Sequence, residues 1–262
     1  MDDLAARIEV LERAAREGGS IAEAAFRTDL TVEEKGHALD AVTDVDRAVQ
    51  RHVVDVLSTA FPDEPIVAEE EDALKEVPAA GPAWLVDPID GTNNFVAGTR
   101  CWATSVAAVA DGEPVAAVNH FPALGDTYRT TPVGVSRNGE AVAVSDRERP
   151  AEVTAGPLYG LGRQDREAYA TVTRRIVDSL GDLRRAGSSQ ATLSRVAAGE
   201  LDAAVSTVRL PPWDTVAGVH LVRRAGGTVT DVDGEPWRHD SQGLVASNGR
   251  AHDALLELVD GV

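Results

Sequence analysis

The stretch Asp87-Pro88-Ile89-Asp90-Gly91-Thr92-Asn93-Asn94-Phe95 places two carboxylates three residues apart, directly after the apolar run of residues 83–86. Such a run predicts a short buried strand, and the fixed φ of Pro88 predicts a sharp turn where the strand ends. Asp87 and Asp90 would then converge on one point. Because hard oxygen ligands without a nearby Cys or His pair suit Mg²⁺ better than zinc, the two acids indicate a magnesium site.

Gly91 and Thr92 add a possible phosphate-binding feature. Glycine lets the backbone approach a ligand closely, and the N–H groups of Gly91 and Thr92 would open a helix whose free donors suit a phosphate oxygen. The same residues are also typical of an ordinary loop with Asx turns and a helix cap. The stretch by itself leaves both interpretations open, so its meaning depends on the rest of the chain.

Further motifs follow one another along the chain at workable spacing. They are Lys35, Asp40-Ala41-Val42-Thr43-Asp44-Val45-Asp46, Ala68-Glu69-Glu70, Gly187-Ser188, Val196-Ala197-Ala198-Gly199-Glu200-Leu201-Asp202, Trp213-Asp214-Thr215-Val216-Ala217-Gly218 and Ala225-Gly226-Gly227. Together with residues 87–92 they resemble the inositol monophosphatase family, Mg²⁺-dependent and lithium-sensitive phosphatases whose motif reads Asp-Pro-Ile/Leu-Asp-Gly-Thr. Ala68 stands where the family has glycine. The resemblance runs nearly from end to end and identifies the chain as a member of this family.

The resemblance implies a layered αβαβα sugar-phosphatase sandwich, and the residue patterns agree with an α+β first half and an α/β second half. Helical spacing of apolar residues predicts a long first helix that ends before Asp29, and a second helix that follows Thr43. Asp111-Gly112 and Asn138-Gly139 predict hairpins of an antiparallel meander. After the polar residues 145–150, short strands alternate with helices. We expect two halves, residues 1–146 and 147–262.

The resemblance also implies a site and roles for its residues. Two or three Mg²⁺ ions would activate water and neutralise phosphate: Glu69, Asp87 and the Ile89 carbonyl would hold one ion, and Asp87, Asp90 and Asp214 another. Thr92, supported by Asp46, would orient the attacking water, with Glu69 as base. The expected substrate-binding residues are Gly91, Thr92, Gly187, Ser188, Thr207 and Lys35. Structural roles stay open for several of them, since Asp46 fits a capping box with Thr43 and both Ser188 and Asp214 fit helix caps.

Two other classes of function remain as alternatives. The Asp-x-Asp-Gly-Thr signature of haloacid-dehalogenase phosphatases is superficially similar, but here two residues separate Asp87 from Asp90, and the motif lies well inside the chain. A non-catalytic binding or regulatory role is the second alternative, against which the intact set of candidate ligands argues. Within the superfamily, a 3′-phosphoadenosine 5′-phosphate phosphatase is a further possibility.

The composition restricts the cellular environment and the partners that we expect for this chain. The net charge is −18, from 43 acidic and 25 basic residues, and only Lys35 and Lys75 are lysines. A polyanion would be repelled, so we expect no nucleic-acid partner. Depletion of lysine in favour of Asp and Glu indicates a halophilic cytoplasm, where salt screens the self-repulsion, with an ordinarily acidic bacterial enzyme as the alternative. The acidic N-terminus is unlike a signal peptide, no apolar run is long enough to span a membrane, and one cysteine, Cys101, excludes an intrachain disulfide. We expect a homodimer, as in the family.

The expected substrate is a small sugar or polyol phosphate. Inositol-specific family members carry a glutamate shortly before Trp-Asp that meets the inositol hydroxyls, whereas this chain has Ser206-Thr207-Val208 there. A hydroxyl binds a vicinal diol less strongly than a carboxylate does. We therefore expect fructose 1,6-bisphosphate to be hydrolysed at least as well as inositol 1-phosphate. The candidate partners of a second phosphate are Arg100, Arg163, Arg166 and Arg209, each of which is also compatible with a solvated surface position.

Overall fold

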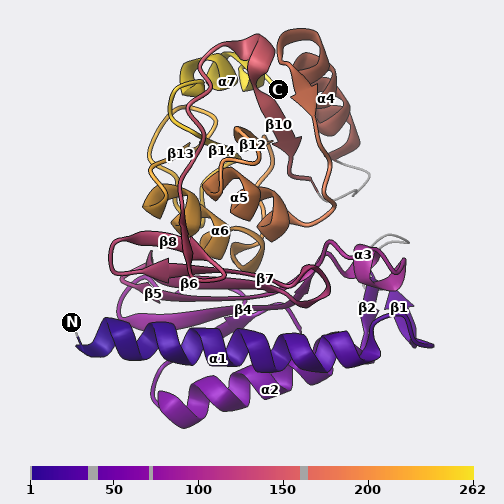
Figure 1. Cartoon of the computed structure of the whole chain (residues 1–262), viewed down its shortest axis with the longest axis vertical. Helices are drawn as coiled ribbons and strands as arrows, with labels where there is room; N and C mark the ends of the chain where they lie inside the picture. Colours follow the sequence, from indigo (N-terminus) through magenta and orange to yellow (C-terminus); the bar gives the residue numbers. More distant parts are fainter. Residues whose placement is uncertain (1, 35–40, 71–72, 160–164) are drawn as a thin grey trace.

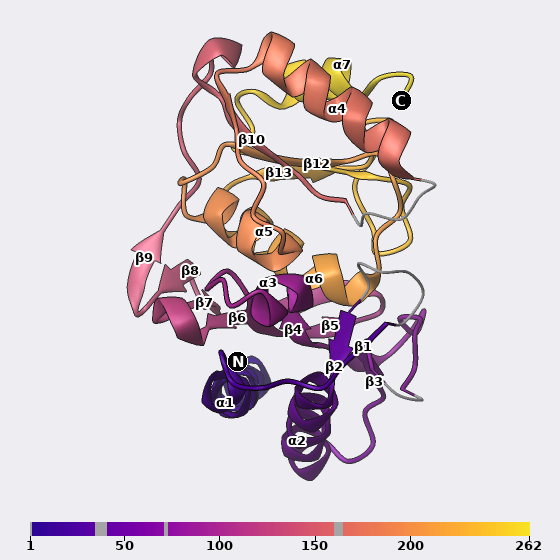
Figure 2. The same ribbon diagram turned by 90° about the vertical axis from the view of Figure 1, so that its right-hand side faces the viewer.

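A computed structural model describes residues 2–34, 41–70, 73–159 and 165–262 of the chain. Helices and sheets alternate in five layers (Figures 1 and 2). Helices α1 (Asp2–Ala25) and α2 (Asp44–Ala60) cover the outer face of one sheet, α5 (Ser189–Ala197) and α6 (Pro212–Arg224) lie between the two sheets, and α4 (Arg166–Ser179) and α7 (His252–Val259) cover the outer face of the other. The predicted αβαβα sandwich is confirmed.

The outer helices form as their sequences predict. Leu11 and Ala15 of α1 are fully buried, as the helical spacing of the apolar residues requires. Helix α2 begins with a capping box, in which the Thr43 hydroxyl accepts hydrogen bonds from the N–H groups of Val45 and Asp46, while the Asp46 carboxylate accepts one from the Thr43 N–H at 2.8 Å. The capping role that the sequence left open for Asp46 is therefore confirmed.

The first sheet contains seven strands among the described residues, in the order β3-β4-β5-β6-β7-β8-β9. Their bounds are β3 Ile66–Ala68, β4 Pro82–Asp90, β5 Ala103–Ala110, β6 Glu113–Phe121, β7 Asp126–Thr131, β8 Gly134–Arg137 and β9 Glu140–Val142. Strand β3 is parallel to β4, and all other neighbours are antiparallel. The predicted turns at Asp111-Gly112 and Asn138-Gly139 join β5 to β6 and β8 to β9, and both Asp111 and Asn138 have φ of 53°.

Strand β4 departs from the prediction in one respect. It does not end before Pro88 but continues to Asp90, and its register with β5 shifts between Asp87 and Asp90. A bulge leaves a residue outside the hydrogen-bond ladder, so proline, which has no N–H, is tolerated there. The expected sharp turn at Pro88 is wrong. The chain turns at Gly91, whose φ of 89° is left-handed, and α3 (Thr92–Val96) follows directly.

The second sheet has the order β11-β10-β12-β14-β13 over the described residues. Its strands are β10 Thr154–Pro157, β11 Asp182–Leu183, β12 Ala203–Ser206, β13 Thr228–Thr230 and β14 Leu244–Ser247. The short elements outside both sheets are β1 Val32–Glu34, β2 Ala41–Thr43 and the 3₁₀ turns Pro122–Leu124 and Pro150–Glu152. Strand β10 is parallel to β11 and β12, while β14 is antiparallel to β12 and β13. The predicted alternation of strands and helices is therefore confirmed.

The middle layer joins the two sheets into one structure. Leu193 of α5 and Leu221 of α6 are fully buried in a core that also contains Leu85 of the first sheet and Leu244 of the second. Packing on both faces fixes the N-termini of α5 and α6 near the end of β4. The sheets change between β9 and β10, around the polar stretch, but the shared core gives no independent division, and the halves 1–146 and 147–262 stay a prediction.

Candidate active site

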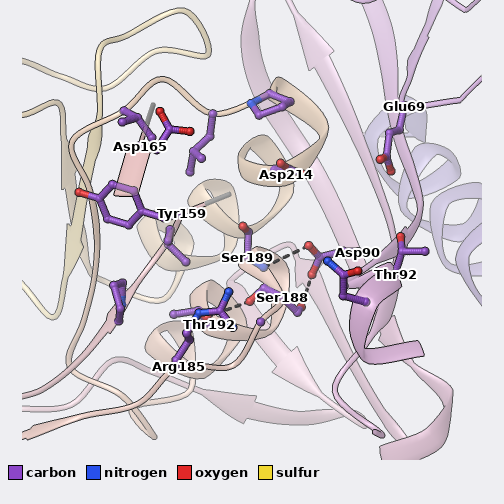
Figure 3. Close-up of a pocket in the computed structure, with 18 of the residues that line it drawn as sticks. Glu69, Asp90, Thr92, Tyr159, Asp165, Arg185, Ser188, Ser189, Thr192 and Asp214 are labelled. Atoms are coloured by element: carbon purple, nitrogen blue, oxygen red, sulfur yellow. Dashed lines mark hydrogen bonds between the residues drawn. The ribbon is translucent and has the colours of Figure 1, made fainter. Parts of the chain in front are cut away.

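A cavity of about 330 Å³ lies where the end of β4 meets the N-termini of α5 and α6. It is lined by Glu69, Asp90, Gly91, Thr92, Asn93, Pro157, Leu158, Tyr159, Asp165, Arg185, Gly187, Ser188, Ser189, Thr192, Val208, Arg209, Leu210, Pro211 and Asp214. Figure 3 shows Glu69 and Thr92 on one side, Tyr159, Asp165 and Arg185 on the opposite side, and Asp90, Ser188 and Asp214 between them. Both sheets and the middle helices therefore contribute to one cavity.

Three acids converge, as the sequence predicts, and two of them, Asp90 and Asp214, line this cavity, whereas Asp87 is not among its lining residues. Asp87, Asp90 and Asp214 each offer a carboxylate oxygen within 4.8 Å of the others. Asp87 and Asp90 come from the bulged end of β4, and Asp214 comes from the first turn of α6. Two carboxylates from one strand thus meet a third that lies more than a hundred residues later in the chain.

Asp87 is the most deeply buried of the three. It is 1 % exposed, and its Oδ1 atom is buried without a hydrogen-bond partner in the part of the chain that the structure describes. Burial raises the pKa of Asp87 well above its ordinary value, and the negative charges of Glu69 and Asp90 add to the increase. A buried carboxylate oxygen without a donor is costly, and a divalent cation would supply the missing positive charge.

Asp90 is held by the N-terminus of α5. Its Oδ2 accepts a hydrogen bond from the Ser188 hydroxyl and one from the Gln190 N–H at 2.9 Å, and its Oδ1 accepts one from the Ser189 N–H at 3.1 Å. Burial raises the pKa of Asp90 to about 6, although these hydrogen bonds oppose the increase. Each carboxylate oxygen has two lone pairs, so Oδ1 keeps one for another ligand. The three acids therefore fit a hard divalent cation such as Mg²⁺.

Glu69 lines the same cavity, although it is outside the group of three within 4.8 Å. Two side chains that the sequence did not single out hold its loop in place. Lys75 Nζ donates hydrogen bonds to the carbonyl oxygens of Ala68 and Glu69, both at 2.8 Å, and lies 5.6 Å from the centre of the Trp213 ring. Gln50 of α2 bonds both main-chain groups of Glu70. The Glu69 loop is thereby tied to α2 and to the start of α6.

Thr92 is placed as the sequence predicts. Its hydroxyl is 3.2 Å from Asp46 Oδ1 and 3.0 Å from the Ile89 carbonyl oxygen, and it can donate its proton to either. Burial raises the pKa of Asp46 above its ordinary value, while hydrogen bonds from Thr43 and Thr92 act in the opposite direction. With its proton directed to Asp46 or Ile89, the Thr92 oxygen presents lone pairs elsewhere.

Gly91 and Gly187 lie where the segment after β4 contacts the segment before α5. A Cβ atom on Gly91 would come within 3.1 Å of the Cys101 carbonyl oxygen and of Ser188 Cβ, and one on Gly187 would come within 3.0 Å of the Asn94 amide. Asn94 joins both sides, because its Nδ2 donates to the Cys101 carbonyl at 2.6 Å and to the Ala186 carbonyl at 2.9 Å. Ser188 caps α5 by accepting from the Ala191 N–H, so its predicted capping role is confirmed.

The remaining predicted substrate residues are placed differently. Thr207 does not line the cavity; it is 5 % exposed, and its hydroxyl lies 2.8 Å from the hydroxyl of Tyr159, which does line it. Lys35 and Arg163 lie outside the described residues. Of the other candidate arginines, Arg209 lines the cavity, whereas Arg100 and Arg166 are not among its lining residues.

The sequence missed Tyr159, Asp165, Arg185 and Thr192 on the far wall. None of them stands in a motif with regular spacing, and they come from separate segments that only the second sheet and α5 bring together. Arg185 follows Arg184 in a polar stretch that looks like a solvated surface. The remaining signal was position alone, because Arg185 lies two residues before Gly187.

Comparison with known proteins agrees with this geometry. Residues 3–262 match the inositol monophosphatase family. The fructose-1,6-bisphosphatase/inositol-1-monophosphatase of Thermotoga maritima is 38% identical over 234 residues, which cover 88% of this chain and 87% of the relative. The Nus factor SuhB of Escherichia coli is 31% identical over 253 residues, covering 95% and 94%. The solved structure of the Thermotoga maritima IMPase has a TM-score of 0.86 at 34% identity and covers 99% of this chain and 97% of its own.

Fold and site together define a phosphatase built on the layered sugar-phosphatase sandwich, with an acidic cluster suited to metal ions. The chain belongs to the inositol monophosphatase family. This membership excludes the alternative that residues 87–92 form the motif of a haloacid-dehalogenase phosphatase, in which an Asp is the nucleophile. Across the described residues, no helix combines the length and apolar character needed to cross a lipid bilayer.

Proposed function

We propose that the chain is a Mg²⁺-dependent phosphomonoesterase that hydrolyses a small sugar or polyol phosphate, fructose 1,6-bisphosphate or inositol 1-phosphate or both. The observation that supports this most directly is Asp87, a buried carboxylate with one oxygen that has no hydrogen-bond partner among the described residues; its carboxylate is grouped with those of Asp90 and Asp214, which line the cavity. Asp87, Asp90, Asp214, Glu69 and the Ile89 carbonyl would hold two or three ions. The bound Mg²⁺ would supply charge neutralisation and a nucleophilic water at neutral pH.

The protein's own groups would orient the reactants. Thr92, with its own proton directed to Asp46 or to the Ile89 carbonyl, would accept a hydrogen bond from the attacking water and so fix its direction. Glu69 would take up the water proton as general base. The N–H groups of Gly91 and Thr92, together with Gly187 and Ser188, would receive the phosphate. No covalent phosphoenzyme is required in this scheme.

The far wall supports a preference for substrates with a second anionic group. Arg185 and Arg209 both line the cavity, and each guanidinium can form paired hydrogen bonds with a phosphate. Thr207 stands where inositol-specific relatives have a glutamate. Its hydroxyl and its main-chain N–H both form hydrogen bonds with the Tyr159 hydroxyl, so it would act on substrate only through Tyr159. We therefore propose that kcat/KM for fructose 1,6-bisphosphate at least equals that for inositol 1-phosphate.

A side-by-side assay at molar KCl tests the proposal. Fructose 1,6-bisphosphate, inositol 1-phosphate and 3′-phosphoadenosine 5′-phosphate are compared with and without EDTA and added Mg²⁺. We expect activity that chelation abolishes and Mg²⁺ restores, with the bisphosphate sugar at least equal to inositol 1-phosphate. A preference for inositol 1-phosphate above tenfold, about 1.4 kcal/mol of discrimination, would refute the substrate assignment. Activity insensitive to chelation would refute the metal mechanism.

The composition supports two further proposals about the environment and partners of the chain, and membership of the family supports a third, its oligomeric state. A charge of −18 with two lysines favours a halophilic cytoplasmic enzyme, which should lose thermal stability as KCl is lowered from the molar range. Full stability in dilute buffer would contradict this. The same charge disfavours a nucleic-acid partner. We also propose a homodimer in solution, and a monomer mass by light scattering at high salt would refute it.

A further inference from the structure

Gln190, in the first turn of α5, contacts both sides of the acid cluster. Its main-chain N–H donates to Asp90 Oδ2 at 2.9 Å, and its side-chain Nε2 donates to the carbonyl oxygen of Trp213 at 2.8 Å. Trp213 directly precedes Asp214, so the Trp213 carbonyl and the Asp214 nitrogen belong to the same planar peptide group. One fully buried side chain therefore restrains the peptide that presents Asp214, while the same residue's backbone holds Asp90.

A buried row of polar side chains supports Gln190 from behind. Asn119 Nδ2 donates to Gln190 Oε1 at 2.9 Å and to Ser194 Oγ at 3.0 Å, and Asn119 Oδ1 accepts from Ser105 Oγ at 2.7 Å. In the sheet register Ser105 stands opposite both Asn119 and Asp87. Because opposite residues present their side chains on the same face of the sheet, the row runs from Asp87 across two strands to Gln190.

Gly218 of α6 leaves space for the Gln190 side-chain amide. A Cβ atom on Gly218 of α6 would lie 2.9 Å from Gln190 Oε1 and 2.4 Å from Leu193 Cβ, so α6 approaches α5 closely only because residue 218 is glycine. The contacts that the structure gives to Gln190 and Asn119 use both ends of each amide. A satisfied network in a buried setting is rigid, whereas a partly satisfied one is costly.

We infer that Gln190 is a positioning residue that fixes Asp214 at a set separation from Asp87 and Asp90, and thereby prepares the site for Mg²⁺. The inference rests on the proposed function. Three carboxylates repel one another before the cation binds, and this repulsion favours a displacement of Asp214 away from Asp87 and Asp90. The bond from Gln190 to the Trp213 carbonyl opposes that displacement. Ligands held in their bound arrangement bind the ion without reorganisation.

Gln190→Met tests the inference, because methionine has similar length and volume but cannot replace these hydrogen bonds, and the main-chain bond to Asp90 remains. We expect Mg²⁺ affinity, measured by titration calorimetry without substrate, to fall about tenfold, ~1.4 kcal/mol. The Mg²⁺ concentration for half-maximal activity should rise by the same factor. The KM for substrate at saturating Mg²⁺ should stay within twofold of the unmodified chain.

Ser194→Ala is the matched control. Ser194 lies on α5, as Gln190 does, and its replacement removes a hydrogen bond from the same Asn119 amide. The bond from Gln190 to the Trp213 carbonyl remains, so Mg²⁺ affinity should stay within twofold. Equal losses of melting temperature in EDTA for the two variants, with Mg²⁺ affinity unchanged in both, would show that Gln190 is only structural. If Gln190→Met does not fold, Asn119→Ala replaces it, with an expected loss of at least threefold in Mg²⁺ affinity, and an unchanged affinity there overturns the inference.

The unmodified chain and Asp90→Asn separate this inference from the proposed function. If the unmodified chain binds no Mg²⁺, the proposed function and the inference fail together. If it binds Mg²⁺, Asp90→Asn abolishes binding and Gln190→Met binds as tightly as the unmodified chain, only the positioning role fails. A selective weakening in Gln190→Met, with Ser194→Ala unchanged, supports both.

Discussion

The two walls of the cavity are built in different ways. On the first-sheet side, Glu69, Asp90 and Thr92 come from one short span of chain, at the ends of adjacent strands and at the start of α3. The opposite wall takes Tyr159, Arg185 and other residues from segments spread over some fifty positions. The first wall, joined by Asp214 of α6, holds the groups suited to metal chemistry, and the second holds groups suited to recognising the rest of a substrate. A fixed strand end keeps reactive groups in register, whereas separate loops can differ without disturbing them.

The largest expected effect is at the acid cluster. Asp90→Asn should keep the fold but lower kcat by at least about a hundredfold, because it removes a charge that balances the metal in the transition state. Asp165→Asn is the control from the opposite wall: it also lines the cavity but is not one of the three acids. Its kcat should fall less than tenfold. Near-normal turnover in folded Asp90→Asn would show that Asp90 takes no part in catalysis and that the two walls do not divide the work as described.

The recognition wall should show a smaller effect, and one selective for substrate. Arg209→Ala and Arg185→Ala should each raise KM for fructose 1,6-bisphosphate about tenfold by removing a charge-assisted contact, while KM for inositol 1-phosphate changes less than twofold. Arg166→Ala, which lies outside the cavity lining, is the control. Equal changes for both substrates would mean that these arginines do not distinguish a second phosphate.

The acid cluster should also govern stability in the absence of metal. Burial raises the pKa of Asp87 well above its ordinary value and that of Asp90 to about 6. The folded chain therefore holds protons that the unfolded chain has released, so stability in EDTA falls as pH rises, from about 4 to about 6 for Asp90. Asp87→Asn should raise the melting temperature in EDTA at pH 7.5 by about 2–4 °C, as ~1 kcal/mol implies.

Calorimetric scans of both proteins at pH 5 and pH 7.5 check this expectation. The advantage of Asp87→Asn should shrink at pH 5 and vanish when Mg²⁺ is added, since the ion stabilises only the unmodified site. A variant that melts lower than the unmodified chain at pH 7.5 in EDTA would show that the Asp87 charge is already compensated within the protein.

The smallest effect is expected at the contact between the walls. Lys75→Met removes the bonds to the carbonyls of Ala68 and Glu69 and the contact with the Trp213 ring, but leaves every proposed ligand in place. The Mg²⁺ requirement for activity should rise about threefold, consistent with ~0.6 kcal/mol. Lys75→Arg keeps the charge and should recover part of this loss. An unchanged Mg²⁺ requirement in Lys75→Met would show that Gln50 holds the Glu69 loop without it.

The sequence by itself determined the family, the layers and the acid cluster. Periodicity and turn residues located the helices and hairpins, because each depends on residues close together in the chain. Asp87 and Asp90 were identifiable for the same reason, and Asp214 through its own motif. The turn expected at Pro88 was wrong because a bulge, which depends on pairing with β5, tolerates proline within the strand.

Only the tertiary structure decided which side chains face the substrate and which support the ligands. Thr207 is turned to Tyr159, Arg185 reaches the cavity, and Gln190 connects Asp90 to the peptide before Asp214. These placements depend on how α5 and α6 pack between two sheets whose strands are distant in sequence. Local propensity carries no information about such contacts, since they are set by the shared core that closes the two sheets around the middle helices.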